Sequence, residues 1–433
     1  MWPTPIRRDQ LCYDAQINAV ASTKALIIVS TSSLLDSRDL HNRRRGLVTL
    51  GQQRHLIVGV RDSGRDDHLM PHHTFAAVDR TYRGFIRAHE WSVCVGAGIS
   101  SGIMPSWIDL TRTVFAKATG QTLTSDSFSK LCNQTGWGMD AWLQASLNSM
   151  IRDGRTRKEF IEIVEDELYK KLLLKAGAAS QKDILLKALV APKKCIKVVE
   201  AQSLLKFMED NFGDQTLFGL ARWLRKSKQC ENPPRAVLTF NADCLLDVVL
   251  SLLATDEHVR NTGEKNFPKE EFKRVLRASD DGREATPIFH LHGCVLPKSG
   301  KSNLHRESRE ELVFPESGYS RISSTVFTWQ QTVFLSHAQS QRLVFIGLSM
   351  SDPNLRRWLS WCTANAVTAQ QHRLNNFNGE YIMGENIWLT TRPSDPAHET
   401  FLESSLLHLG TRIGWLDSWN QLPEALNNLL GLD

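Results

Sequence analysis

The stretch that decides the fold is Trp91-Ser-Val-Cys-Val-Gly-Ala-Gly-Ile-Ser100. Its apolar first half predicts a buried strand, and two glycines and a helix-capping serine follow at once. Glycines let the main chain approach a ligand closely, and the first N–H groups of a helix face an anion. Such a handover from strand to helix is typical of sites where a pyrophosphate lies against the backbone. Alone it is a weak signal, because position 101 is Ser and the third glycine of the usual dinucleotide fingerprint is displaced to Gly102.

The bulk properties are those of an ordinary soluble protein. The chain has 433 residues, 41% of them hydrophobic and 23% charged, which is enough for a large core and two or three structural units. The net charge of +5 is small, and the densest basic cluster, Arg43-Arg44-Arg45, fits a solvated turn better than a nucleic-acid contact. We therefore expect no direct nucleic-acid binding.

Cysteine usage and hydropathy bear on the compartment. The eight cysteines are dispersed with no C-x-x-C pair, so neither a disulfide scaffold nor a local zinc knuckle is expected. No apolar run approaches the length of a membrane span, and the N-terminus lacks the apolar core of a signal peptide. The sequence predicts a reduced, cytoplasmic protein without a membrane partner.

The chain changes character along its length. We expect an N-terminal extension of unknown role at 1–85, with candidate strands at Lys24–Ser30 and His55–Val60, and a tail at 426–433. Between them, 86–425 forms one domain. A helix is expected over Phe75–Glu90, and helical periodicity from Trp107 to about Lys228 predicts a helical insertion at about 110–235.

Short apolar runs separated by helices predict the sheet. After Ser92–Val95 they are Ala236–Phe240, Ile288–His292, Arg342–Gly347 and Asn386–Thr390. Continuous apolar strands of this kind argue for a parallel sheet covered on both faces, so the expected fold is α/β, a Rossmann-like sheet with an inserted helical layer. The charged stretches 254–286 and 295–310 are expected to be loops. In such sheets the ligand lies beyond the carboxyl ends of the strands.

Four of these strand ends carry polar or glycine-rich tips. They read Gly96-Ala-Gly-Ile-Ser100, Thr239-Phe-Asn-Ala-Asp243, His290-Leu-His-Gly293 and Gly347-Leu-Ser-Met-Ser-Asp-Pro-Asn354. In this order they resemble the sirtuin fold, specifically the sirtuin-like NAD-consuming proteins of bacterial antiphage defence. The resemblance covers roughly residues 88–425.

The resemblance implies roles for particular residues. Asn241 would reach the nicotinamide ribose and the attacking water, and His292 would be the general base. Asp243 would bind the amide or support the site, with His290 structural. Gly347 and Ser349 would hold the adenosine half. The other NAD-binding positions implied are Gly96, Ala97, Gly98, Ile99, Ser100, Trp107 and Thr239.

Local sequence leaves plainer interpretations open. Asn241 and Asp243 are also the residue types that cap a helix, here one beginning near Cys244. His290 and His292 share one face of a strand, but no nearby ligands complete a metal site. Asp352-Pro353-Asn354 has the pattern of a helix start. We expect no metal.

The function expected from the resemblance is that of an NAD+ hydrolase. Nicotinamide leaves NAD as a neutral group, so the site must place a nucleophile rather than supply an acid. Sirtuin deacetylases carry a zinc module with two cysteine pairs, and this chain has no C-x-x-C. Water is therefore the expected nucleophile, giving nicotinamide and ADP-ribose and depleting cellular NAD as an antiphage effector.

Other functions remain open at this stage. They are an NAD-dependent protein deacylase or ADP-ribosyltransferase, a non-catalytic subunit that senses NAD or ADP-ribose, and a Rossmann dehydrogenase, which the displaced third glycine disfavours. The resemblance implies a homo-oligomer, or a partner such as a ring-forming ATPase, a nuclease or a phage-sensing subunit.

Overall fold

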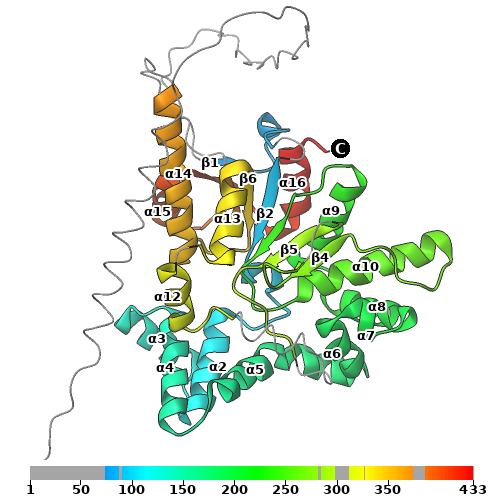
Figure 1. Cartoon of the computed structure of the whole chain (residues 1–433), viewed down its shortest axis with the longest axis vertical. Helices are drawn as coiled ribbons and strands as arrows, with labels where there is room; N and C mark the ends of the chain where they lie inside the picture. Colours follow the sequence, from blue (N-terminus) through cyan, green and yellow to red (C-terminus); the bar gives the residue numbers. More distant parts are fainter. Residues whose placement is uncertain are drawn as a thin grey trace, which may run out of the picture. The chain divides into compact units, whose positions relative to one another are not determined.

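The sheet at the centre of the fold is wholly parallel. The computed structural model describes residues 74–86, 90–280, 284–297, 312–325, 327–373 and 386–432. Eight strands lie in the order β1-β8-β7-β6-β2-β3-β5-β4 (Figure 1). Their bounds are β1 Thr74–Ala76, β2 Trp91–Val95, β3 Val237–Thr239, β4 Phe272–Val275, β5 Thr286–His290, β6 Arg342–Ile346, β7 Asn386–Thr391 and β8 Thr411–Leu416. The α/β, Rossmann-like prediction is confirmed.

The register brings the ends of four strands into one row. Val95, the last residue of β2, pairs with Thr239 of β3 on one side and with Ile346 of β6 on the other. Thr239 pairs in turn with His290, the last residue of β5. After β2 the chain builds the sheet toward β4, and it then returns to the other side of β2 at β6. The topological switch point therefore lies between β2 and β6, where parallel sheets of this kind bind ligands.

Helices cover both faces because the strands are apolar on both. Val93 and Val95 share one core cluster with residues of α9 (Thr216–Gln229), α10 (Leu245–Thr262) and α16 (Leu422–Leu430). Cys94 faces the opposite way, into a cluster with residues of α13 (Trp329–Ser340) and α14 (Pro353–Arg373). This alternation is the period of two expected of a strand. It leaves the carboxyl edge as the place where polar groups gather.

The helical layer between β2 and β3 is confirmed. With α9 as its last helix, it consists of α2 Trp107–Thr119, α3 Ser125–Thr135, α4 Met139–Arg152, α5 Arg157–Ala178, α6 Lys182–Val190, α7 Pro192–Cys195 and α8 Val198–Phe212. Caps set several of its boundaries: Ser106 accepts from Asp109 N at the start of α2, and Gly120 ends α2 in the left-handed conformation. Two further helices, α12 (Glu316–Ser324) and α15 (Pro396–Leu406), complete the described fold.

Three sequence expectations are wrong. The described part of Phe75–Glu90 contains the end of β1 and a 3₁₀ turn, Arg80–Tyr82, instead of an α-helix, because the backbone at 74–76 pairs with β8. The stretch 254–286 contains the end of α10 and strand β4 rather than a loop. The helix expected directly after the glycine turn is a four-residue 3₁₀ helix, Ala97–Ser100, and the long helix α2 begins only at Trp107.

The sheet and its cover extend past both expected domain boundaries. β1 lies before residue 86, and α16 continues past 425 to Leu430 with buried leucines against the core. The candidate strands at Lys24–Ser30 and His55–Val60, and 298–310 of the second expected loop, lie outside the described residues. Within the described ranges, no helix combines the length and apolar character needed to cross a bilayer.

Candidate functional site

The two loops at the switch point touch through their backbones. Gly98 N donates to Gly347 O at 2.9 Å. A Cβ added at Gly96 would lie 2.6 Å from Gly347 O, and one at Gly98 would lie 2.8 Å from the same atom. Gly347 has φ of +66°, and a Cβ there would lie 2.6 Å from Ile99 N. The three glycines are thus required by the packing of the loops themselves, a role that the motif alone does not reveal.

The β3 tip buries three polar side chains. Thr239 Oγ1 accepts from Asn241 N at 3.1 Å, which bends the chain back over the end of the strand. The Oδ1 atom of Asn241 is buried and has no hydrogen-bond partner among the described residues. Asp243 Oδ1 accepts from Leu245 N at 3.0 Å, at the start of α10. Asp243 thus bonds the first N–H of α10 from the position before the N-cap, Cys244, whereas the Asn241 Oδ1 atom is left for another role.

Asp243 lies beside Ser100 of the glycine turn. Burial raises the pKa of Asp243, and the Leu245 N–H, the Ser100 hydroxyl and the charge of His290 oppose this rise. The Ser100 hydroxyl is itself buried, and no hydrogen bond of normal geometry joins it to another described residue. The structure thus brings the tips of β2, β3 and β5 together, as the strand pattern predicts.

His292 sits in an aromatic enclosure with one free ring nitrogen. Its ring meets the rings of Phe240 and Tyr319 edge-on, with centroids at 5.0 and 5.2 Å. Its Nε2 lies 3.6 Å from Asp352 Oδ2, too far for a hydrogen bond, and has no other partner in the described part of the chain. Burial lowers the pKa of His292, and Asp352 opposes that effect. The ring is therefore neutral near pH 7 and able to accept a proton.

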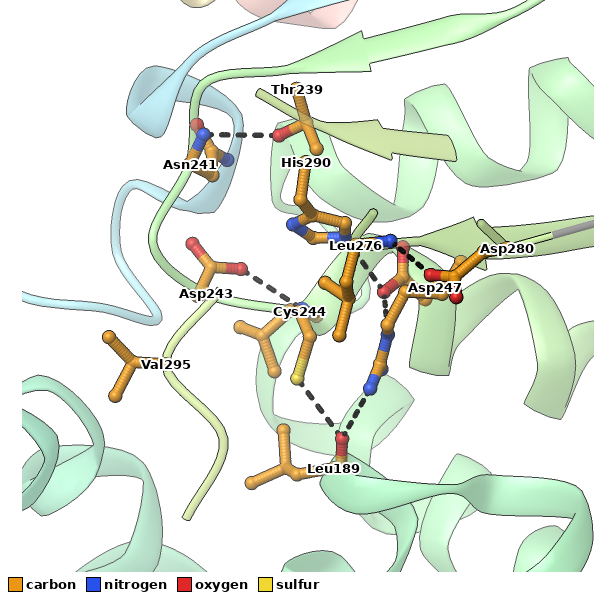
Figure 2. A network of polar contacts seen from close by, with 12 residues as sticks. Leu189, Thr239, Asn241, Asp243, Cys244, Asp247, Leu276, Asp280, His290 and Val295 are labelled. Carbon is orange, nitrogen blue, oxygen red and sulfur yellow. Dashed lines mark hydrogen bonds and ion pairs between the residues drawn. The ribbon is translucent and has the colours of Figure 1, made fainter. Parts of the chain in front are cut away.

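A charged network that sequence reasoning missed lies below the β5 tip (Figure 2). His290 Nε2 is 3.1 Å from Asp247 Oδ2, and the Arg274 guanidinium donates to the same carboxylate oxygen. Arg274 also donates to the carbonyls of Leu189 and Val190, which end α6. Arg274 belongs to β4, in the stretch expected to be a loop. Its position beside Asp247 of α10 could not be inferred from spacing.

Six unpartnered buried polar atoms of the described residues lie at this edge. Each belongs to a residue that is at least nine-tenths buried or has a nearly buried side chain, and each has no hydrogen-bond partner among the described residues. They are Ser100 Oγ, Asn241 Oδ1, Asp247 Oδ1, His290 Nδ1, His292 Nε2 and Asn354 Nδ2. Buried polar groups are normally paired, so such a cluster fits a polar ligand. Two surface hollows, of about 620 and 730 Å³, are lined by other residues.

The remaining predicted residues lie around this cluster. Trp107 is half-buried and packs edge-on against Phe314, with centroids at 5.6 Å. Ser349 is exposed and shares a 2.6 Å hydrogen bond with Ser351. Asp352 Oδ1 accepts from Leu355 N at 2.8 Å, so this carboxylate caps the first turn of α14, as its sequence pattern predicts.

No metal site accompanies the cluster in the part of the chain that is described. There, no group of three or more His, Cys, Asp or Glu side chains is placed to hold an ion. The expectation that the reaction needs no zinc stays a prediction.

The comparison with protein families agrees with this geometry. Residues 235–409 match the family model of the SIR2-like domain. Over this segment the chain is similar to SIR2-like domains. The matched segment includes the tips of β3, β5 and β6, and the β2 tip, which precedes it, joins them through the register of the sheet. The resemblance to sirtuins is thus confirmed, and the match supports an NAD-dependent activity of the sirtuin kind. A search of curated proteins gave no match.

Proposed function

We propose that this SIR2-like protein hydrolyses NAD+ to nicotinamide and ADP-ribose. The observation that carries the proposal is a pair of buried atoms at the β3 and β5 tips, Asn241 Oδ1 and His292 Nε2, which have no hydrogen-bond partner within the described ranges. Thr239 pairs with His290 in the sheet, so these two tips are neighbours. Hydrolysis requires a group that orients the attacking water and a base that takes its proton. An amide side chain can do the first, and a neutral imidazole can do the second.

The reaction balances with these two side chains. The bond between the nicotinamide nitrogen and ribose C1′ breaks, and its electron pair neutralises the positive charge of the nicotinamide ring. The water oxygen forms the new bond to C1′ as it gives up a proton. In our proposal Asn241 orients that water and His292 Nε2 takes the proton. No general acid is needed, because nicotinamide departs as a neutral molecule.

The surroundings of His292 suit a base better than an acid. Burial lowers its pKa, so the ring is unprotonated before the substrate arrives. Phe240 and Tyr319 hold the ring edge-on and limit its rotation. The Asp352 carboxylate, 3.6 Å away, stabilises the imidazolium that forms when the proton is taken.

The decisive experiment is incubation of the purified protein with NAD+ alone, with products resolved by chromatography. We expect nicotinamide and ADP-ribose in equal amounts. His292→Ala and Asn241→Ala should each lower the rate on the order of 10²–10⁴-fold. Undiminished turnover by either variant would refute the site assignment.

A control reaction separates hydrolysis from the other NAD-consuming chemistries. A deacylase or an ADP-ribosyltransferase consumes NAD+ in step with an acyl peptide or a protein acceptor. Turnover without either acceptor, at a rate that an added acetyl-lysine peptide does not raise, is the result expected of a hydrolase. Strict dependence on the peptide would assign the chain to deacylation instead.

We further propose that the activity depletes cellular NAD in antiphage defence, within a homo-oligomer or beside a partner such as a ring-forming ATPase or a phage-sensing subunit. The resemblance of the four tips to defence sirtuins supports this proposal. Phage challenge of cells that carry the wild-type or the His292→Ala gene, with NAD measured over time, tests it. Loss of protection in the variant is expected. Light scattering of the purified protein gives the oligomeric state.

A further inference from the structure

His290 is held more firmly than the proposed base two residues away. It is 1% exposed, and its Nε2 faces the Asp247 carboxylate at 3.1 Å. That carboxylate is fixed in turn by Arg274, which is anchored on two α6 carbonyls. Three elements, α10, β4 and α6, thus hold one ring at the end of β5. His292, by contrast, is held by the rings of Phe240 and Tyr319, and the carboxylate nearest its Nε2 among the described residues, that of Asp352, is 3.6 Å away.

The network determines which nitrogen of His290 is left free. Burial alone would raise the pKa of Asp247, but the Arg274 guanidinium, which donates to its Oδ2, and the hydrogen bond to His290 help to lower that pKa. Asp247 is therefore ionised and can only accept, so Nε2 of His290 carries the proton. In the neutral ring Nδ1 is then an acceptor. It is buried and unpartnered among the described residues.

The free nitrogen belongs to the same side of the site as the proposed catalytic pair. His290 pairs in the sheet with Thr239, whose hydroxyl accepts from Asn241 N. Asp243 lies near enough for its pKa to respond to His290. In Figure 2 the His290 ring lies between Asp247 and the tip that carries Asn241 and Asp243. A substrate group that reaches Asn241 and His292 therefore comes from the half of NAD that carries the bond to be broken.

We propose that His290 is a substrate-binding residue whose Nδ1 accepts a hydrogen bond from the nicotinamide riboside half of NAD, with Asp247 and Arg274 as the residues that position it. This inference rests on the proposed function, which supplies the substrate. It assigns a binding role to a residue for which the resemblance implies only a structural one. The donor is an N–H of the carboxamide or a ribose hydroxyl.

Two substitutions separate the two ring nitrogens. The amide nitrogen of Gln reaches the position of Nε2, so His290→Gln keeps a donor to Asp247 and deletes the Nδ1 acceptor. The amide of Asn instead occupies the position of Nδ1, so His290→Asn keeps a polar group there and leaves Asp247 without that donor. His337→Gln is the matched control, because His337 is a half-buried histidine of α13 whose Nδ1 bonds to Ser92, near the start of β2, and to Gln341.

The test is calorimetric binding of two probes to the full chain. They are carbocyclic NAD, which keeps the nicotinamide and the hydroxyls but resists hydrolysis, and ADP-ribose, which lacks the nicotinamide. We expect His290→Gln to raise the Kd for carbocyclic NAD about tenfold or more and the Kd for ADP-ribose less than twofold. His337→Gln should change neither. An unchanged Kd for carbocyclic NAD in His290→Gln, or an equal loss for both probes, would overturn the proposal.

His290→Asn keeps the proposal testable if His290→Gln does not fold. It should melt at a lower temperature than the unaltered protein, because Asp247 loses a donor, yet retain most of its affinity for carbocyclic NAD. A folded His290→Asn protein that no longer binds this probe would also refute the assignment. Selective loss of binding in His290→Gln without any NAD turnover by the unaltered protein would uphold this inference and refute the proposed hydrolysis.

Discussion

The carboxyl edge of the sheet is built differently on the two sides of β2. Toward β6, two loops approach through their backbones, and Gly96, Gly98 and Gly347 leave no room for a Cβ. Toward β3 and β5, buried polar side chains gather, several of them without a partner among the described residues. The β6 side therefore fixes the path of the backbone, and the β3 and β5 side supplies the polar groups that can contact a substrate. A substitution should therefore damage stability on the β6 side and substrate handling on the β5 side.

Asp247 lies on the β5 side but is expected to contribute both to the stability of the fold and to the positioning of His290. Its substitution is therefore the strongest test of the comparison. Asp247→Ala would leave Arg274 and His290 buried without their carboxylate. Removing one member of a buried ion pair costs about 3–5 kcal/mol, so we expect a loss of that order. Denaturant unfolding measures it.

The control for Asp247 is an ion pair of similar length in a more exposed position. Arg222 and Glu209 are 2.9 Å apart, with side chains 49% and 37% exposed. Glu209→Ala should cost less than about 1 kcal/mol. Equal losses of unfolding free energy in the two variants would mean that the His290 network stabilises the fold no more than a surface ion pair does.

Gly347→Ala tests the backbone side. The substitution adds left-handed strain of about 1–2 kcal/mol and an overpacking cost of about 1–3 kcal/mol against Ile99. Gly120→Ala is the matched control, because Gly120 has φ of +72° but nothing within 4 Å of an added Cβ. Gly347→Ala should lower the thermal midpoint clearly more than Gly120→Ala. A smaller or equal shift would show that the loops do not need their close approach.

A smaller effect is expected from pH on the chemical side. Burial lowers the pKa of His292 below its ordinary value of 6.5. The unfolded chain therefore binds this proton more readily, and the stability that His292 contributes is present above pH 6.5 and lost as the pH falls below it. The base is needed unprotonated, so the acid limb of kcat/KM should also lie below 6.5.

Substitution of Asp352 tests the direction in which this acid limb moves. Its carboxylate favours the protonated ring, so Asp352→Asn should move the acid limb to still lower pH. A pH–rate series for the two proteins measures the limb directly. A limb at or above 6.5, or an upward move in the variant, would contradict the role given to His292.

The smallest change is expected at Ser349. Its side chain is exposed and bonds only to Ser351 among the contacts described, so Ser349→Ala should alter stability by less than about 0.5 kcal/mol. If the hydroxyl binds the adenosine half, the Kd for ADP-ribose should rise about 2- to 10-fold. An unchanged Kd would mean that the β6 side acts through its backbone alone.

The strands that end at the candidate site could be predicted because each has a clear local sequence pattern. Apolar runs such as Ser92–Val95 and Arg342–Gly347 end in glycine or polar tips, and parallel pairing then places those tips in one row. β4 was missed because Phe272-Lys-Arg-Val275 carries two charges in four residues. One of these charges, Arg274, is stabilised by Asp247, and no local pattern indicates that pairing.

The glycines show a second limit of sequence reasoning. Gly96 and Gly98 predict a close approach, but the sequence does not say what approaches, and in the structure it is the Gly347 loop. Likewise, Asn241 and Asp243 are equivalent as helix caps by residue type. Only the fold shows that the Asp243 carboxylate bonds the first N–H of α10 while Asn241 Oδ1 has no partner among the described residues.

The pairing of β1 with β8 has a consequence for biosynthesis. β1 is formed by residues 74–76 and has a single neighbour in the sheet, β8, formed by residues 411–416. A ribosome releases the first of these segments long before it makes the second. The edge strand therefore cannot pair with β8 until residues 411–416 have been translated.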